Sequence, residues 1–180
     1  TRQARAGFIE AAQRESNAMA AQSKSKSLII PCETRNREFD AKLLLACVAA
    51  ERGFDVYLGA KREINIWAAR LPRSIYLQKS LSKRSYRMYD ILDRVGHWIV
   101  STDEEGIVYQ SLDFYWKLKI HPATFHKTRA LFAWGRDNDR IWRTHPAFHG
   151  VPIEISGNPR VDLLRPELRG YFADQINELR

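Results

Sequence analysis

Cysteine is scarce in this sequence: Cys32 and Cys47 are the two cysteines among 180 residues. The first falls in a predicted strand and the second on a predicted helix face, so we expect buried thiols and no disulfide framework. No apolar run approaches the ~20 residues that a membrane-spanning helix needs, and no signal-peptide pattern opens the chain. These absences favour the reducing environment of the cytoplasm.

Several motifs of enzyme active sites are also missing. No Gly-rich phosphate loop follows the first predicted strand, which argues against a P-loop nucleotide hydrolase and a dinucleotide-dependent oxidoreductase. No Gly-x-Ser-x-Gly elbow is present, and neither cysteine has an evident activating neighbour. His145 and His149 have the spacing of two metal ligands on a helix, but Pro146 and Gly150 argue against a regular helix there. Because no acidic third ligand is close by, we expect no metal site in this part of the protein.

The charge balance is basic, since 29 Lys and Arg against 21 Asp and Glu give a net charge of +8. Such a balance favours anionic partners: nucleic acid, an anionic membrane surface or a phosphorylated substrate. The basic residues form no dense tract, and a solvated surface accounts for most of them. No helix-turn-helix or RNA-binding motif is present, so we do not expect a nucleic-acid partner.

The stretch from residue 27 to residue 54 organises the chain. Residues 28–32 are a continuous apolar run, as in a strand buried on both faces. A polar elbow follows, in which Thr34 or Asn36 can cap a helix. The helix is predicted from residue 38 to Gly53, with an apolar face of Phe39, Leu43, Ala46, Cys47 and Ala50. A second strand at 55–59 completes a βαβ unit.

Strands and helices then alternate to the end of the chain. Further strands are predicted at residues 74–77, 97–101, 130–135 and 151–157. Helices are predicted at 61–71, 82–95, 112–119, from about 121 onward, at 137–144 and at 166–179. This alternation predicts an α/β fold: a Rossmann-like open parallel sheet of about six strands with helices on both faces.

Polar residues and glycines come directly after the predicted strands, where open parallel sheets bind their ligands. They are Glu33, Gly59, Lys79, Ser80, Asp103, Glu104, Glu105, Gly106, Gly135, Gly157, Asn158 and Pro159. Carboxylates there can act as a general base or bind sugar hydroxyls, and glycines allow a ligand to approach the backbone. Alternatively, Glu33 is a solvated acid near a helix N-terminus, and residues 103–106 are an acidic turn.

Residues 114–127 interleave aromatic and basic side chains. The aromatic residues are Phe114, Tyr115, Trp116 and Phe125, and the basic ones include Lys117, Lys119, His121, His126 and Lys127. One interpretation is an amphipathic helix that packs on the sheet. The other is a surface for a lipid head group or for peripheral attachment to the inner face of a membrane.

Four sequence blocks carry a resemblance to a known family. They are Glu33-Thr34 leading into residues 37–46, and then residues 103–106, 132–135 and 157–164. In this order they resemble the amino-terminal half of bacterial surface carbohydrate biosynthesis proteins. Those proteins are similar to GT-B glycosyltransferases and have relatives among Kdo (3-deoxy-octulosonic acid) transferases and polyol-phosphate transferases. The resemblance covers nearly all of residues 27–180.

The resemblance implies a domain organisation. In GT-B enzymes two Rossmann-like domains face each other, and the first binds the acceptor while the second binds the sugar nucleotide. Residues 27–165 would be the acceptor-type domain, and residues 166–180 would form a helix that leads to a second domain absent from this sequence. Residues 16–19 resemble the scar of a cleaved purification tag before Met19, so residues 1–26 are interpreted as a tag remnant and a flexible lead-in.

The resemblance also implies roles for residues. Glu33 would be the base that deprotonates the acceptor hydroxyl. The expected acceptor-binding residues are Asp103, Glu104, Glu105, Gly106, Gly135, Gly157 and Asn158, and the three acids are the second choice for the base. The acceptor would be a saccharide or a lipid-linked saccharide, and the donor a nucleotide-activated sugar, with no cofactor in this domain. The alternative is a non-catalytic Rossmann-like module that binds an anionic ligand.

Overall fold

The structure is a computed structural model, and it describes residues 26–105 and 109–178. The interpretation of residues 1–26 therefore falls, except for Lys26, outside the described residues, and so does the predicted acceptor-binding residue Gly106. In the described part of the chain, no helix is long and apolar enough to cross a membrane.

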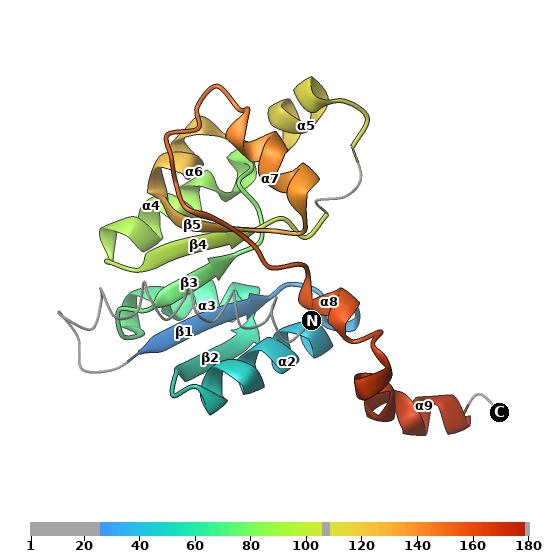
Figure 1. The fold of residues 1–180 in the computed structure, drawn as a ribbon. Coiled ribbons are helices and arrows are strands. Elements are labelled where there is room, and N and C mark those ends of the chain that lie inside the picture. The colour runs from blue at the N-terminus through green and yellow to red at the C-terminus, as the bar shows by residue number, and fades with distance from the viewer. Residues whose placement is uncertain (1–25, 106–108, 179–180) are drawn as a thin grey trace.

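Six parallel strands form one open sheet in the order β2-β1-β3-β4-β5-β6 (Figure 1). The strands are β1 (Ser27–Cys32), β2 (Asp55–Ala60), β3 (Ile75–Gln78), β4 (Trp98–Thr102), β5 (Thr128–Ala133) and β6 (Ile153–Ile155). The predicted fold class is confirmed. The strand order reverses between β1 and β3, because the chain goes outward from β1 to β2 and then returns past β1 to β3.

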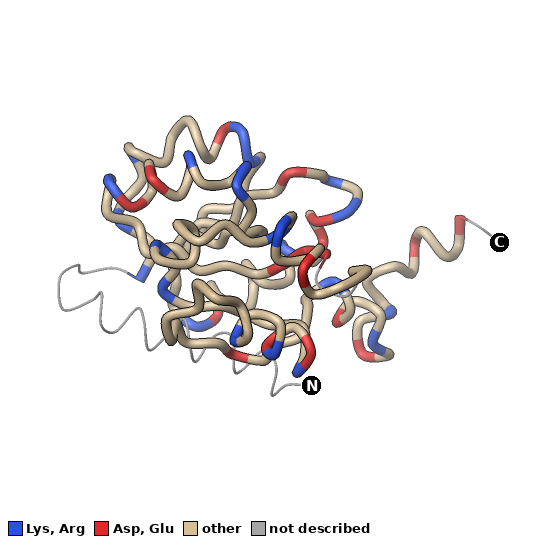
Figure 2. The backbone as a smooth tube through the Cα atoms, turned by 90° about the horizontal axis from the view of Figure 1, so that it is seen from above, with Lys and Arg blue, Asp and Glu red and all other residues tan. Residues whose placement is uncertain are grey.

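The helices keep to the predicted alternation. Those described are α2 (Arg35–Glu51), α3 (Lys61–Trp67), α4 (Tyr86–Arg94), α5 (Leu112–Lys119), α6 (Pro122–Lys127), α7 (Arg136–Arg143), α8 (Pro159–Asp162) and α9 (Ala173–Glu178). Three 3₁₀ segments cover Ala68–Arg70, Lys83–Ser85 and Pro166–Phe172. Figure 2 shows Lys and Arg spread over many helices and loops, interleaved with Asp and Glu.

The two faces of the sheet have separate cores, because successive strand residues point to opposite faces. On one face, α2 packs with Leu45 and Ala49 against Leu28 and Ile30 of β1. On the other face, Ile29 belongs to a second core. The helices and the 3₁₀ segment after α3 contribute to that core Ala68, Tyr89, Leu92, Tyr115, Phe125, Ile141 and Trp142. Right-handed crossovers require this arrangement when the chain reverses direction along the sheet.

The face that α2 buries differs from the predicted one. The buried residues are Glu38, Ala41, Lys42, Leu45, Ala46 and Ala49, so Ala46 alone of the predicted face is buried. Cys47 is exposed, contrary to the prediction, whereas Cys32 is buried as predicted. The prediction failed because it excluded charged residues from the packed face, and Glu38 and Lys42 lie there as an ion pair at 2.7 Å.

Two other helix predictions need correction, and one helix was not predicted. The helix predicted at 61–71 becomes 3₁₀ after Trp67, whose side chain is 48% exposed and does not lie on a packed face. The helix predicted at 166–179 is a 3₁₀ segment followed by the short α9, and its Tyr171 and Ile176 are also exposed. Helix α8 was not predicted; Asn158 caps it by accepting a hydrogen bond from the Arg160 amide at 2.9 Å.

Candidate functional site

Strands β1 and β3 separate at their carboxyl ends, where the strand order reverses. Their pairing consists of Leu28 with Ile75 and Ile29 with Tyr76, whereas β1 pairs with β2 along its whole length. Pro31, near the end of β1, has no N–H to donate to a neighbouring strand. In open α/β sheets a ligand binds outside such a reversal point. The residues directly after β1 and β3 therefore form the candidate site.

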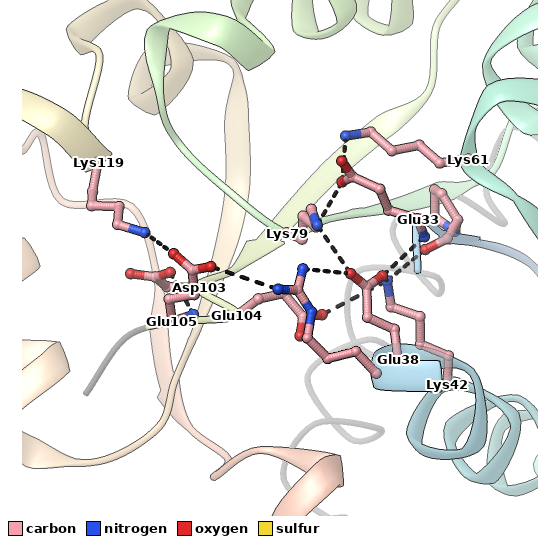
Figure 3. A network of polar contacts seen from close by, with 11 residues as sticks. Glu33, Glu38, Lys42, Lys61, Lys79, Asp103, Glu104, Glu105 and Lys119 are labelled. Carbon is pink, nitrogen blue, oxygen red and sulfur yellow. Dashed lines mark hydrogen bonds and ion pairs between the residues drawn. The ribbon is translucent and has the colours of Figure 1, made fainter. Parts of the chain in front are cut away.

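Glu33 comes directly after β1, and Lys79 directly after β3. The Lys79 ammonium lies 2.5 Å from the Glu33 carboxylate, and Lys61 at the start of α3 lies 3.0 Å from the same carboxylate (Figure 3). The hydrogen bonds from Lys79 and Lys61 lower the pKa of Glu33. Glu33 is thus at the sheet edge with a 46% exposed side chain, but its two lysine partners reduce its strength as a base. Its assignment as the catalytic base stays a prediction.

Glu38 is the buried centre of the charged network. Its side chain is fully buried, and its carboxylate accepts hydrogen bonds from the Glu33 amide at 3.0 Å, Lys42 at 2.7 Å and Lys79 at 3.0 Å. Burial by itself would raise the pKa of Glu38, but these hydrogen bonds lower it well below the usual value. Glu38 therefore holds the start of α2 against the ends of β1 and β3 in its ionised form at neutral pH.

Lys42 connects this network to the next strand end. Its ammonium donates to the Pro31 carbonyl at 2.6 Å and lies 3.7 Å from the Glu104 carboxylate. Glu104 is the second residue after β4, and its side chain is 15% exposed. Lysines and glutamates alternate along one chain of contacts (Figure 3), in the order Lys61, Glu33, Lys79, Glu38, Lys42 and Glu104. The edge of the sheet is thus lined by compensated charges.

Asp103 has a structural position within its turn. One carboxylate oxygen accepts the Glu105 amide at 3.0 Å, and the other accepts the Tyr115 hydroxyl at 2.5 Å. The Trp134 indole N–H donates to the Asp103 carbonyl. Asp103 is buried, so it orders the turn and fixes the ring of Trp134. Its predicted contact with an acceptor stays untested.

Glu105 points away from this buried turn. Its carboxylate lies 2.5 Å from Lys119 and 3.9 Å from Arg37, and its side chain is 60% exposed. The hydrogen bond from Lys119 is the main reason why the pKa of Glu105 is lowered.

A pocket lies between α2 and the segment that connects β6 to α8. Its charged lining residues are Glu38, Lys42, Glu104, Arg160 and Asp162, and Gly157 and Asn158 belong to its wall. Its apolar lining comes from Ala41, Leu44, Leu45, Val48, Leu77, Trp134 and Pro159. Gly157 has φ +75°, which favours glycine and lets the chain turn sharply after β6.

The structure brings together only part of the predicted set. Glu104, Gly157 and Asn158 line the pocket, whereas Gly135 does not, although it is the neighbour in sequence of the pocket residue Trp134. Sequence reasoning named Lys79 as a strand-end residue but missed Glu38 and Lys42 as site residues. The available signal was a Glu and a Lys four residues apart, directly after the first elbow, together with a lysine at the end of the third strand.

The two histidines considered as metal ligands contact different side chains. His145 packs against the rings of Trp116 and Phe125, and burial lowers its pKa. His149 stacks on His126, with ring centroids 4.7 Å apart. Among residues 26–105 and 109–178, no group of three or more His, Cys, Asp or Glu side chains is placed to hold a metal ion.

Comparison of the chain with protein families, with curated proteins and with solved structures found no match. The fold and the site define an α/β protein with one all-parallel sheet and a charged network at the reversal of its strand order.

Proposed function

We propose that this chain is the acceptor-binding lobe of a cytoplasmic glycosyltransferase in bacterial surface polysaccharide biosynthesis. The observation that carries the proposal is the convergence of four separate sequence blocks on one pocket. Glu38, Glu104, Trp134 and Gly157 come from the four blocks that resemble the surface carbohydrate biosynthesis proteins, and all four residues line the pocket beside α2. Such convergence is expected if the blocks share a ligand.

The lining of the pocket suits a saccharide. An apolar wall with an indole ring can pack against the C–H face of a sugar, while carboxylates accept hydrogen bonds from its hydroxyls. The indole of Trp134 is held by its bond to the Asp103 carbonyl, so the ring is positioned before a ligand arrives. Glu104 belongs to the turn after β4 and is one of the carboxylates that line the pocket.

In the proposed reaction a carboxylate takes the proton of an acceptor hydroxyl. The oxygen then forms a bond to the anomeric carbon of the donor, and the bond from that carbon to the nucleotide phosphate breaks. Glu33, at the neighbouring strand end and outside the pocket lining, is the first candidate for the base, and Glu104, which lines the pocket, is the second. The nucleotide-activated sugar would bind to another domain, since this lobe offers no phosphate loop of a known type.

The proposal includes an acceptor at or near a membrane. In the aromatic and basic segment, Tyr115 and Phe125 are buried in the core, which agrees with the packed-helix interpretation. Phe114 and Leu118, one turn apart on α5, are 45% and 53% exposed. These two apolar side chains beside Lys117 support a peripheral membrane contact of the kind that interfacial helices make.

Binding and turnover measurements test the proposal in two steps. Saccharides and lipid-linked saccharides are titrated into the ¹⁵N-labelled 180-residue chain. The expected result is a shift of the Trp134 indole and Gly157 amide signals, which Glu104→Gln weakens and the exposed Glu63→Gln leaves unchanged. Shifts confined to other regions would contradict the pocket as the acceptor site.

Turnover separates a transferase from a binding module. We expect the 180-residue chain alone to bind acceptor and transfer no sugar, because positioning donor and acceptor together is a large part of catalysis. A natural protein that contains this chain and a donor-binding domain should transfer sugar from a nucleotide donor. Acceptor binding without transfer by that longer protein would favour the non-catalytic module.

A further inference from the structure

A shallow hollow lies at the α3 side of the sheet edge, separate from the pocket beside α2. It is lined by Cys32, Glu33, Ala60, Lys61, Arg62 and Asn65. The Asn65 side-chain oxygen accepts the Tyr76 hydroxyl, which fixes the amide at the wall of the hollow. Of these lining residues, Glu33 is the one that was predicted as a site residue, in the role of catalytic base.

Cations surround the one carboxylate of this hollow. Lys61 and Lys79 hold Glu33 from two sides at 3.0 Å and 2.5 Å, and Arg62 is the next residue of α3. Figure 3 shows the Glu33 carboxylate between the two ammonium groups. The lysine side chains are 33% and 20% exposed, and that of Glu33 is 46% exposed. Water and solutes can therefore reach the ion pairs.

Glu33 can leave the lysines without disturbing the buried part of the network. Its backbone amide is the group that contacts Glu38, and its side chain belongs to a surface residue with free rotation about several bonds. Lys79 would keep its contact with the buried Glu38 carboxylate at 3.0 Å. An anion that entered the hollow and displaced this flexible carboxylate would meet Lys61 in the lining, and Lys79 at the place that the carboxylate had left.

We propose that Lys61 and Lys79 form a binding site for a phosphate monoester, and that Glu33 occupies this site as an internal carboxylate until the ligand displaces it. The proposal does not depend on the glycosyltransferase assignment. If that assignment also holds, the phosphate belongs to the acceptor.

The charge of the ligand decides between a phosphate monoester and a carboxylate. A monocarboxylate ligand would replace Glu33 one charge for one charge, and would have to compete with a group that is tethered beside the lysines. A phosphate monoester carries nearly two negative charges at neutral pH and has three acceptor oxygens. It can bind both lysines at once and leave an oxygen for Arg62 or Asn65.

Titration of methyl phosphate into the 180-residue chain at constant ionic strength tests the proposal, with amide shifts and calorimetry as readouts. Glu33→Gln should tighten binding by about tenfold, because the internal competitor is lost. Lys61→Met and Lys79→Met should each weaken it by about tenfold. Lys26→Met, at the opposite end of β1, is the matched control and should have no effect.

The pH and the ligand provide further controls. Methyl phosphate should bind more tightly at pH 7.5 than at pH 5, because its second pKa is about 6, whereas acetate should bind weakly at both. Lys79→Met also removes a partner of Glu38, so its unfolding curve is measured beside that of Lys61→Met, which touches only the surface pair.

Two results would overturn the site. One is unchanged affinity in Glu33→Gln, and the other is an equal loss in Lys26→Met and Lys61→Met. The Trp134 indole signal reports on the saccharide pocket, so a failure of the phosphate site can be told apart from a failure of the proposed function.

Discussion

Glu38 and Lys42 form a buried ion pair one helical turn apart on α2, with 2.7 Å between the carboxylate and the ammonium. The pair occupies the packed face of a helix that is otherwise lined there by Ala and Leu. Each member also holds a strand end: Glu38 accepts the Glu33 amide, and Lys42 donates to the Pro31 carbonyl. The pair therefore fixes how α2 meets the candidate site.

Removing the charge of Glu38 should destabilise the fold. Glu38→Gln leaves Lys42 and Lys79 without their shared carboxylate, and breaking a buried ion pair typically costs about 3–5 kcal/mol. Urea unfolding measures the loss. Glu51→Gln, at the exposed end of the same helix, is the control and should change stability by less than about 0.5 kcal/mol. Equal effects of the two changes would show that the network does not support the fold.

The same carboxylate makes stability depend on pH. The pKa of Glu38 is lower in the folded chain than in the unfolded chain, so its contribution is complete above the unfolded value and is lost as the pH falls below it. Stability should therefore fall below about pH 4.3. Urea unfolding from pH 7 to pH 3 should show a smaller fall in Glu38→Gln than in the wild type. Parallel curves would exclude Glu38 as the source.

Gly157 should tolerate substitution less well than Gly135. An added Cβ meets nothing within 4 Å at either position, so space does not distinguish them. Gly157 has φ +75°, whereas Gly135 has an extended backbone that any residue adopts. Gly157→Ala should cost about 1–2 kcal/mol, and Gly135→Ala about 0.5 kcal/mol or less. Matched unfolding curves of the two variants provide the measurement.

The two cysteines should react at very different rates. Cys47 is exposed, while Cys32 is 8% exposed and burial raises the pKa of its thiol. A thiol reagent should modify Cys47 rapidly and Cys32 only when the chain unfolds, since the thiolate is the reactive form. Mass spectrometry with Cys47→Ala as control identifies the site. Rapid labelling of that variant would show that Cys32 is accessible.

Glu33 and Glu104 can be separated as candidates for the base. In a full transferase, loss of the base should lower kcat by about 10²–10⁴-fold. Glu33→Gln is expected to show this loss while the domain stays folded, because its side chain lies at the surface. If Glu33→Gln transfers sugar at the normal rate and Glu104→Gln does not, Glu104 is the base. Glu33 is then only the ion-pair partner of Lys61 and Lys79.

The sequence predicts the sheet well because each buried strand is a short apolar run between polar turns. It predicts the face of α2 poorly, since a rule that keeps charges out of the core cannot anticipate a Glu38–Lys42 pair whose partners come from β1 and β3. The acidic residues directly after β1 and β4 are visible in the sequence, so both strand ends could be predicted as parts of a site. Lys79 stands out only as a residue at a strand end, because its importance depends on contacts with two residues more than forty positions earlier.

The pairing of β1 with β3 ends before Pro31, which has no N–H to donate to a neighbouring strand. Beyond the second residue pair, β1 and β3 are joined by side chains and not by the backbone ladder. At this edge Glu38 lines the pocket beside α2 and Glu33 lines the hollow beside α3, and Lys79 contacts both carboxylates. If both proposals hold, a single ligand that carries a saccharide and a phosphate would span the edge of the sheet. Because Lys79 contacts one carboxylate from each cavity, the occupancy of one cavity would then affect the other.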